Sequence, residues 1–194
     1  MHSLFIETVR KITPLTESEL NAILERFRVR TFPKNSMLVE QGKTCKEIFF
    51  INKGMVRTFL NHDGVEITNW VALPGTIETS AQSFINKIPS PFTLEAVTDT
   101  EVLAIKRDDY YQLLKINRPF NDIVIKMMED FYLRMEDKFY SYLFLSAEAR
   151  YRKMKRQFPD HFNAVPLKYL ASILRVQPST LSRLRKKIKK TSAT

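Results

Sequence analysis

The chain has 194 residues, 44% of them hydrophobic, and a formal net charge of +10, which allows one large domain or two smaller ones. Its single cysteine, Cys45, excludes a disulfide framework and argues against an iron–sulfur cluster or structural zinc, so we expect no cofactor and no metal. It has neither the apolar segment of a signal peptide nor about 18 consecutive apolar residues, so we expect a cytoplasmic protein without a membrane partner.

Two short helices are expected first, one over residues 3–12 and one beginning at Thr16, which with Glu19 forms a capping box. From residue 28 to 106, runs rich in Val, Ile, Phe and Thr alternate with turn signals such as Asp63-Gly64. The expected strands are residues 29–32, 37–40, 48–51, 56–60, 66–73, 92–97 and 102–105. Short strands at this spacing predict an antiparallel barrel or jelly roll.

A short helix capped by Asp108 and a long helix from Pro119 to about residue 145 should follow. Apolar residues recur in the long helix at heptad spacing, interrupted once by Lys138. Other faces of this helix are also apolar, so we expect one side on the barrel and another on a second chain, although packing on its own barrel alone is the alternative. The predicted dimer interface is Val124, Met128, Phe131, Met135 and Tyr142.

The basic residues are concentrated at the C-terminus. Residues 151–194 hold 12 Lys/Arg and one acid, Asp160, whereas the first 150 residues hold 19 bases and 20 acids. A helix is expected over residues 147–157, and two amphipathic helices joined by a tight turn over 166–188. Such a split indicates a nucleic-acid module on a neutral body; a solvated basic tail is the alternative.

In the second of these helices, Pro178 fits the first turn. Leu181, Leu184 and Ile188 form the inner face. The residues left facing outward all donate hydrogen bonds and none is acidic, as a helix in the major groove of DNA requires. They are Ser179, Thr180, Ser182, Arg183, Lys186 and Lys187.

The order of these parts resembles the Crp/Fnr superfamily of transcription regulators, and the branch common in Bacteroidetes in particular. The likeness is carried by Phe49-Phe-Ile-Asn-Lys-Gly-Met-Val-Arg57, Ser146-Ala-Glu-Ala-Arg-Tyr151, Val165-Pro-Leu-Lys-Tyr-Leu-Ala-Ser-Ile-Leu174 and Thr180-Leu-Ser-Arg-Leu-Arg-Lys186. The resemblance implies an α+β chain with a cyclic-nucleotide-binding-like jelly roll (1–117), a dimerisation helix (118–145) and an all-α helix-turn-helix domain (146–194). It also implies a homodimer on inverted-repeat double-stranded DNA, with RNA polymerase as a partner.

The chain departs from the cyclic-nucleotide binders of the superfamily. No Glu directly follows Gly75, and Pro91 stands about where an Arg would hold the phosphate. Cyclic AMP is therefore not the expected effector, and the small molecule, if there is one, is unidentified. The four cysteines of oxygen-sensing relatives are missing, and His62 lies in a predicted turn, where exposure is expected rather than haem ligation.

Four barrel residues are candidates for an effector pocket: Arg57, Trp70, Glu78 and Glu95. For each of them an ordinary surface or core position is the alternative. A cavity of about 300 Å³ or more with polar groups would favour small-molecule control, but the 14 phenylalanines favour a filled barrel. No catalytic constellation is present, so an enzyme is not expected.

The turn between the last two helices has Arg175 where relatives have glycine, which predicts a positive φ at a cost of about 1 kcal/mol. Arg183 is the predicted reader of guanine, with a phosphate contact as the alternative, and Ser182 precedes it as in relatives. Gln177, Ser179 and Thr180 should contact bases or phosphate at the helix start. The predicted phosphate contacts are Lys168, Arg175, Lys186 and Lys187. A ligand-binding module whose basic tail acts through protein or RNA contacts is the alternative function.

Overall fold

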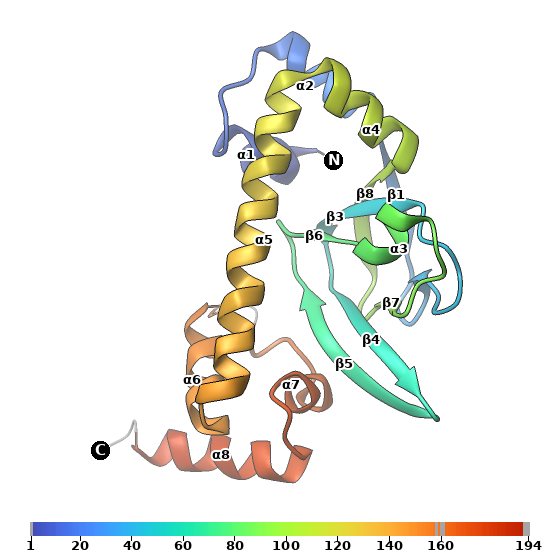
Figure 1. The fold of residues 1–194 in the computed structure, drawn as a ribbon. Helices are drawn as coiled ribbons and strands as arrows, with labels where there is room; N and C mark the ends of the chain where they lie inside the picture. The colour runs from blue at the N-terminus through green and yellow to red at the C-terminus, as the bar shows by residue number, and fades with distance from the viewer. Residues whose placement is uncertain (1, 158, 160–161, 192–194) are drawn as a thin grey trace.

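The computed structural model describes residues 2–157, 159 and 162–191 (Figure 1). The long helix α5 runs along most of the molecule, with the β-sheets on one side of it. The helices α1, α2 and α4 lie at one end of α5, and α6, α7 and α8 lie at the other. The arrangement therefore places the basic C-terminal part at the end of a long spacer.

Two four-stranded antiparallel sheets form the β part, with strand orders β1-β8-β3-β6 and β2-β7-β4-β5. The strands are β1 (Phe27–Phe32), β2 (Met37–Val39), β3 (Glu47–Lys53), β4 (Val56–His62), β5 (Val65–Ala72), β6 (Ile77–Glu78), β7 (Thr93–Ala96) and β8 (Thr100–Lys106). The expected jelly roll and its seven strands are confirmed, as is the β4–β5 hairpin at Asp63-Gly64. The two-residue strand β6 was not anticipated, because it is too short to show an alternating pattern.

The helices are α1 (Ser3–Arg10), α2 (Glu17–Leu24), α3 (Ala81–Asn86), α4 (Arg107–Ile116), α5 (Arg118–Phe144), α6 (Ala147–Gln157), α7 (Leu167–Ile173) and α8 (Pro178–Thr191). The Thr16–Glu19 capping box opens α2 as predicted. Asp108 does not cap α4; it lies in the first turn, and Lys106 is the N-cap. Asn117 caps α5, where its Oδ1 accepts a hydrogen bond from the backbone N–H of Phe120 at 2.9 Å.

Aromatic and aliphatic side chains fill the interior of the barrel. Phe49 of β3 and Phe84 of the helix at residues 81–86 are almost completely buried in one cluster, and Trp70, Phe92 and Tyr110 pack against it. The filled barrel agrees with the expectation from the phenylalanine content. A second cluster seats α1, α2 and α5 on the outer face of the first sheet.

A third cluster joins the β part to the C-terminal helices. Met55, Val71, Leu73 and Val97 of the β part pack with apolar residues of α6, α7 and α8. The C-terminal helices therefore share a core with the barrel, and Figure 1 shows α7 beside β5. The position of α8 is thus fixed by contacts to the rest of the chain.

Candidate nucleic-acid interface

Helix α8 is held on the molecule by its apolar stripe. Leu181 is completely buried and Ile188 nearly so, both against Leu170 of α7 and its neighbours. Because these residues occupy one face of the helix, the residues between them turn toward solvent. The basic segment is therefore a packed helix with a defined outer face.

The turn between α7 and α8 has the left-handed backbone that was predicted. Arg175 has a φ of 54°. Its N–H donates to the carbonyl of Ser172 at 3.0 Å, and the N–H of Val176 donates to that of Ala171 at 3.0 Å. This is a Schellman motif with arginine in the place of the usual glycine. The motif satisfies the last carbonyls of α7 and sets the direction in which α8 leaves.

The outer face of α8 carries the hydrogen-bond donors that were expected there. Ser179, Thr180, Arg183 and Lys186 are exposed, and Ser182 is partly exposed. Gln177 and Lys168 are also exposed near the start of each helix, with the Lys168 ammonium 4.9 Å from the centre of the Tyr169 ring. The helix contains no acidic residue, so nothing on it would repel a phosphate.

In α8, Lys187 and Arg185 contact other parts of the protein. Lys187 forms an ion pair with Glu148 of α6, its Nζ 3.1 Å from the Oε2 atom, while its side chain is still largely exposed. Arg185, which was not assigned a role, points inward, where its Nη2 is 3.3 Å from the Asn163 Oδ1 atom. It fixes α8 to the preceding loop and is separate from the exposed set.

Among the candidate effector residues, Arg57 and Glu95 lie together in the barrel wall. Arg57 donates from Nε and Nη2 to the Glu95 carboxylate at 3.1 and 2.8 Å, and both side chains are buried. The Arg57 guanidinium also lies over the rings of Phe59 and Tyr169, at 3.9 and 4.5 Å. The pair is therefore engaged with its own chain, and through Tyr169 it connects the barrel to α7.

Glu78 and Trp70 lie on the α5 side of the β part. Burial raises the pKa of Glu78 to about 7, although the Thr79 N–H donates to its carboxylate at 3.2 Å and Lys138 attracts it. Trp70 stands beside Lys138, whose Nζ is 5.7 Å from the indole ring centre. These two residues thus lie near a lysine that belongs to α5.

Lys138 is the residue that interrupted the predicted heptad seam, and the structure explains it. Its Nζ donates to the backbone oxygen and the Oδ1 atom of Asn69, at 2.9 and 2.8 Å. Val124 also turns toward the barrel, and the Tyr142 hydroxyl donates to the Ile173 carbonyl at 2.6 Å. Val124 and Tyr142 of the predicted interface therefore have contacts within their own chain, and the interface stays a prediction.

The apolar face that remains exposed on α5 overlaps the predicted seam. It retains Met128, Phe131 and Met135 of the predicted set. This exposed stripe consists of Ile125, Met128, Phe131, Tyr132, Met135 and Phe139. Large side chains in a continuous exposed row are uncommon on a monomer and mark an interaction surface.

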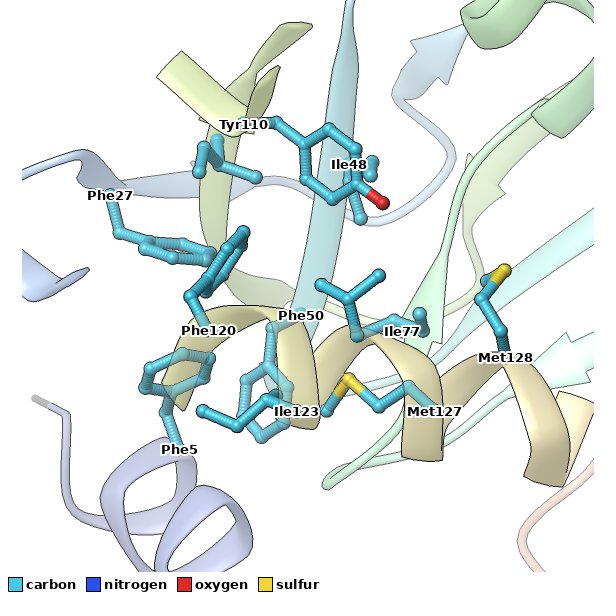
Figure 2. Close-up of a pocket in the computed structure, with 12 residues that line it drawn as sticks. Phe5, Phe27, Ile48, Phe50, Ile77, Tyr110, Phe120, Ile123, Met127 and Met128 are labelled. Carbon is cyan, nitrogen blue, oxygen red and sulfur yellow. The ribbon is translucent and has the colours of Figure 1, made fainter. Parts of the chain in front are cut away.

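A cavity of about 50 Å³ lies at the other end of α5, between α1, α5 and the first sheet (Figure 2). Its walls are apolar and aromatic, and Tyr110 contributes the one hydroxyl visible among the labelled side chains. Ligand pockets are usually about 300–1,000 Å³, so this gap is too small for an effector. We interpret it as imperfect packing under α5.

Two negative findings concern the described part of the chain. None of its helices is long and apolar enough to cross a membrane. Within the same residues, no three His, Cys, Asp or Glu side chains gather as metal ligands would.

Comparison with known proteins supports the arrangement just described. Residues 29–117 match the cyclic nucleotide-binding domain family. The Cyclic AMP receptor protein of Thermus thermophilus is 29% identical over 102 residues, which are 52% of this chain and 47% of that protein. The matched segment thus spans about half the length of this relative.

Solved structures share the fold over most of the chain. FixK2 from Bradyrhizobium japonicum has a TM-score of 0.72 at 16% identity, with 86% of both chains covered. A CooA mutant from Carboxydothermus hydrogenoformans has a TM-score of 0.69 at 17% identity, covering 93% of this chain and 87% of that one. At these identities the likeness concerns the fold.

The fold and the family match define the class: a cyclic nucleotide-binding domain followed by a long helix and a helix-turn-helix. The family match over residues 29–117 and the shared fold agree with the resemblance of this chain to the Crp/Fnr superfamily of regulators. Its place in the Bacteroidetes branch stays a prediction.

Proposed function

We propose that the chain is a sequence-specific transcription regulator that binds inverted-repeat DNA as a homodimer. The observation that carries the proposal is the outer face of α8, where Ser179, Thr180 and Arg183 are exposed on a helix anchored by buried Leu181. An exposed row of donors without acids suits the base edges and phosphates of a major groove. Arg183 is the proposed guanine reader, and Lys168, Arg175, Lys186 and Lys187 are proposed phosphate contacts.

The exposed stripe of α5 supports the dimer. Burial of this stripe against a second copy would remove large apolar side chains from water. The two α5 helices would then hold two copies of α8 at a fixed separation, as a two-fold DNA site requires. RNA polymerase is the proposed protein partner of the complex, by analogy with the superfamily, and no catalytic activity is part of the proposal.

Control by cyclic AMP is not part of the proposal. Residues 75–96 correspond by resemblance to the phosphate-binding segment of cyclic-nucleotide binders. In this stretch Ser90 Oγ donates to Ser80 Oγ at 2.7 Å, and both serines are buried. The nearby guanidinium of Arg107 donates to the carbonyls of Phe84 and Cys45, at 2.6 Å each. Both sets of groups therefore form hydrogen bonds within the chain.

Selection from random-sequence duplexes tests the function. The purified full chain is mixed with the duplex pool, and the retained DNA is sequenced. Enrichment of an inverted repeat with half-site centres roughly 34–36 Å apart supports the proposal. Uniform retention would contradict it and would favour a ligand-binding module whose basic segment acts through RNA or protein contacts.

A further inference from the structure

A cavity of about 330 Å³ lies where α5, α6 and α7 meet β5. It is within the usual size range of small-molecule sites, roughly 300–1,000 Å³. It lies outside the barrel, and its walls come from both the β part and the C-terminal helices. We call this cavity the hinge pocket; the side chains that matter for its chemistry are Trp70, Arg134, Lys138, Tyr142, Arg150 and Lys153.

The hinge pocket has an excess of positive charge. Four of the residues that line it are cationic, and one, Asp137, is acidic. The Asp137 carboxylate is already occupied, because it is paired with Lys153 and accepts a hydrogen bond from Gln157 Nε2 at 3.1 Å. Among the described residues, no carboxylate forms a salt bridge with the other three cations. An anion is therefore the ligand that the charge of the pocket favours.

Arg150 is positioned by neutral groups only. Its Nη1 and Nη2 atoms donate to the carbonyls of Leu145 and Leu174, at 2.6 and 2.9 Å. Its Nε atom is buried and has no hydrogen-bond partner in the described structure. A buried guanidinium N–H without a hydrogen-bond partner is costly. The two carbonyls are neutral and do not balance the positive charge of Arg150, whereas an anion in the pocket would balance it.

Lys138 also forms no salt bridge with a carboxylate among the described residues. The atoms that accept from its Nζ belong to the neutral Asn69. Burial and, to a smaller extent, the nearby positive charge of Arg175 lower the pKa of Lys138 to about 8, against the attraction of Glu78. A negative group beside Lys138 would reverse this cost.

Two aromatic rings stand next to these cations. The Lys138 ammonium is 5.7 Å from the Trp70 ring centre and 5.8 Å from that of Tyr142. The Arg150 guanidinium is 5.7 Å from the Tyr142 ring centre. Apolar or aromatic walls with a few charged groups are the usual composition of a site for a small organic ligand.

We propose that the hinge pocket binds a small aromatic anion, an aryl phosphate or aryl carboxylate, with its charge at Lys138, Arg134 and Arg150 and its ring beside Trp70. Such a ligand would contact α5, α6 and α7 at once. It would therefore add to the contacts that hold the C-terminal helices against the barrel and would further stabilise the position of α8. The effect on DNA binding rests on the proposed function, whereas binding to the pocket does not.

Trp70 makes the test direct, because it is the one tryptophan of the chain. Phenyl phosphate is titrated into the full chain without DNA, and binding is followed by tryptophan fluorescence and by calorimetry. We expect saturable binding, weaker binding of inorganic phosphate and of phenol, and a dissociation constant raised roughly tenfold by Arg134→Gln or Lys138→Gln. Arg134→Gln is the safer variant, because this arginine is exposed.

Lys155→Gln is the matched control, since it removes the same charge from an exposed position of α6 outside the pocket. Absence of saturable binding at millimolar phenyl phosphate would overturn the proposal. Equal weakening by Lys155→Gln would also overturn it, because attraction would then come from the net charge alone. A change in self-association in place of a change in binding, seen by sedimentation of Arg134→Gln, would assign the pocket to the contact between copies.

Discussion

Thr68 and Ser172 exchange two hydrogen bonds across the boundary between the barrel and the helix-turn-helix. The Thr68 N–H donates to Ser172 Oγ at 2.8 Å, and the Ser172 hydroxyl lies 3.2 Å from the Thr68 carbonyl, to which it donates. The two residues are 104 positions apart in the sequence, and Thr68 is almost completely buried. The two hydrogen bonds of Ser172 therefore link α7 of the helix-turn-helix to β5.

Ser172→Ala should loosen this attachment. The buried N–H of Thr68 would lose its partner, which costs about 1–3 kcal/mol. We expect a lower free energy of unfolding in urea and faster amide hydrogen exchange at Thr68. Ser179→Ala, at an exposed position on α8, is the control and should change neither quantity. Unchanged exchange at Thr68 would show that this pair of hydrogen bonds contributes little to holding the two parts together.

Arg57 offers a comparison between a buried and an exposed partner. Its guanidinium pairs with Glu95, whose side chain is 10% exposed, and with Glu66, whose side chain is 45% exposed. Arg57→Met should cost about 3–5 kcal/mol, because the Glu95 charge would remain buried without a partner. Glu66→Gln should cost less than about 1 kcal/mol. Urea unfolding of both variants measures the two costs, and equal losses would mean that Glu95 reaches solvent.

Glu78 should make the stability depend on pH. Its pKa is raised from 4.5 to about 7 by burial. The folded state then binds the proton more tightly than the unfolded state, so this contribution to stability is complete below pH 4.5 and is lost as the pH rises through about 7. Unfolding free energies measured from about pH 5 to about pH 8 should therefore fall.

Glu78→Gln should remove this fall and should be more stable than the natural chain at about pH 8, by on the order of 2 kcal/mol. Glutamine still offers an oxygen to the Thr79 N–H, so the packing is kept. Glu40→Gln, at an exposed site, should leave the pH profile unchanged. A profile that falls equally in Glu78→Gln would assign the pH dependence to another group.

The apolar pattern of α5 shows which features of the helix could be predicted from the sequence and which could not. The heptad spacing correctly indicated a helix with two apolar sides, but it could not tell which residues the barrel would cover. Val124 packs against the barrel, the Tyr142 hydroxyl donates to α7, and the Lys138 ammonium donates to Asn69. Which side of a helix faces its own domain depends on contacts between distant segments, and these leave no periodic trace in the sequence.

The backbone of the turn in the helix-turn-helix, by contrast, was predicted correctly. Because Arg175 stands where relatives have glycine, the resemblance predicted its positive φ, and the structure has this φ at 54°. The hinge pocket was not anticipated, because its lining residues come from β5, α5, α6 and α7. The one sequence signal for it was the lysine within an otherwise apolar seam.

Tyr132→Glu should weaken the proposed dimer. Tyr132 is 67% exposed within the apolar stripe of α5, and a carboxylate there would be buried without a partner in a dimer. We expect the dissociation constant, measured by sedimentation equilibrium, to rise by on the order of a hundredfold. Val65→Glu, at a residue with 62% exposure at the start of β5, is the control and should stay dimeric. A chain that is already monomeric at high concentration would contradict the proposed interface.

Arg183 and Lys186 should have different effects on DNA binding, although both are exposed cations of α8. If Arg183 donates to a guanine, Arg183→Ala loses about 1–3 kcal/mol of discrimination at one base pair. Lys186→Ala should instead weaken all duplexes alike and reduce the slope of log affinity against log salt by about one. Lys186 is a cleaner comparison than Lys187, which is paired with Glu148. Binding to single-base variants of the selected site, at several salt concentrations, separates the two effects, and a uniform loss for Arg183→Ala would make Arg183 a phosphate contact.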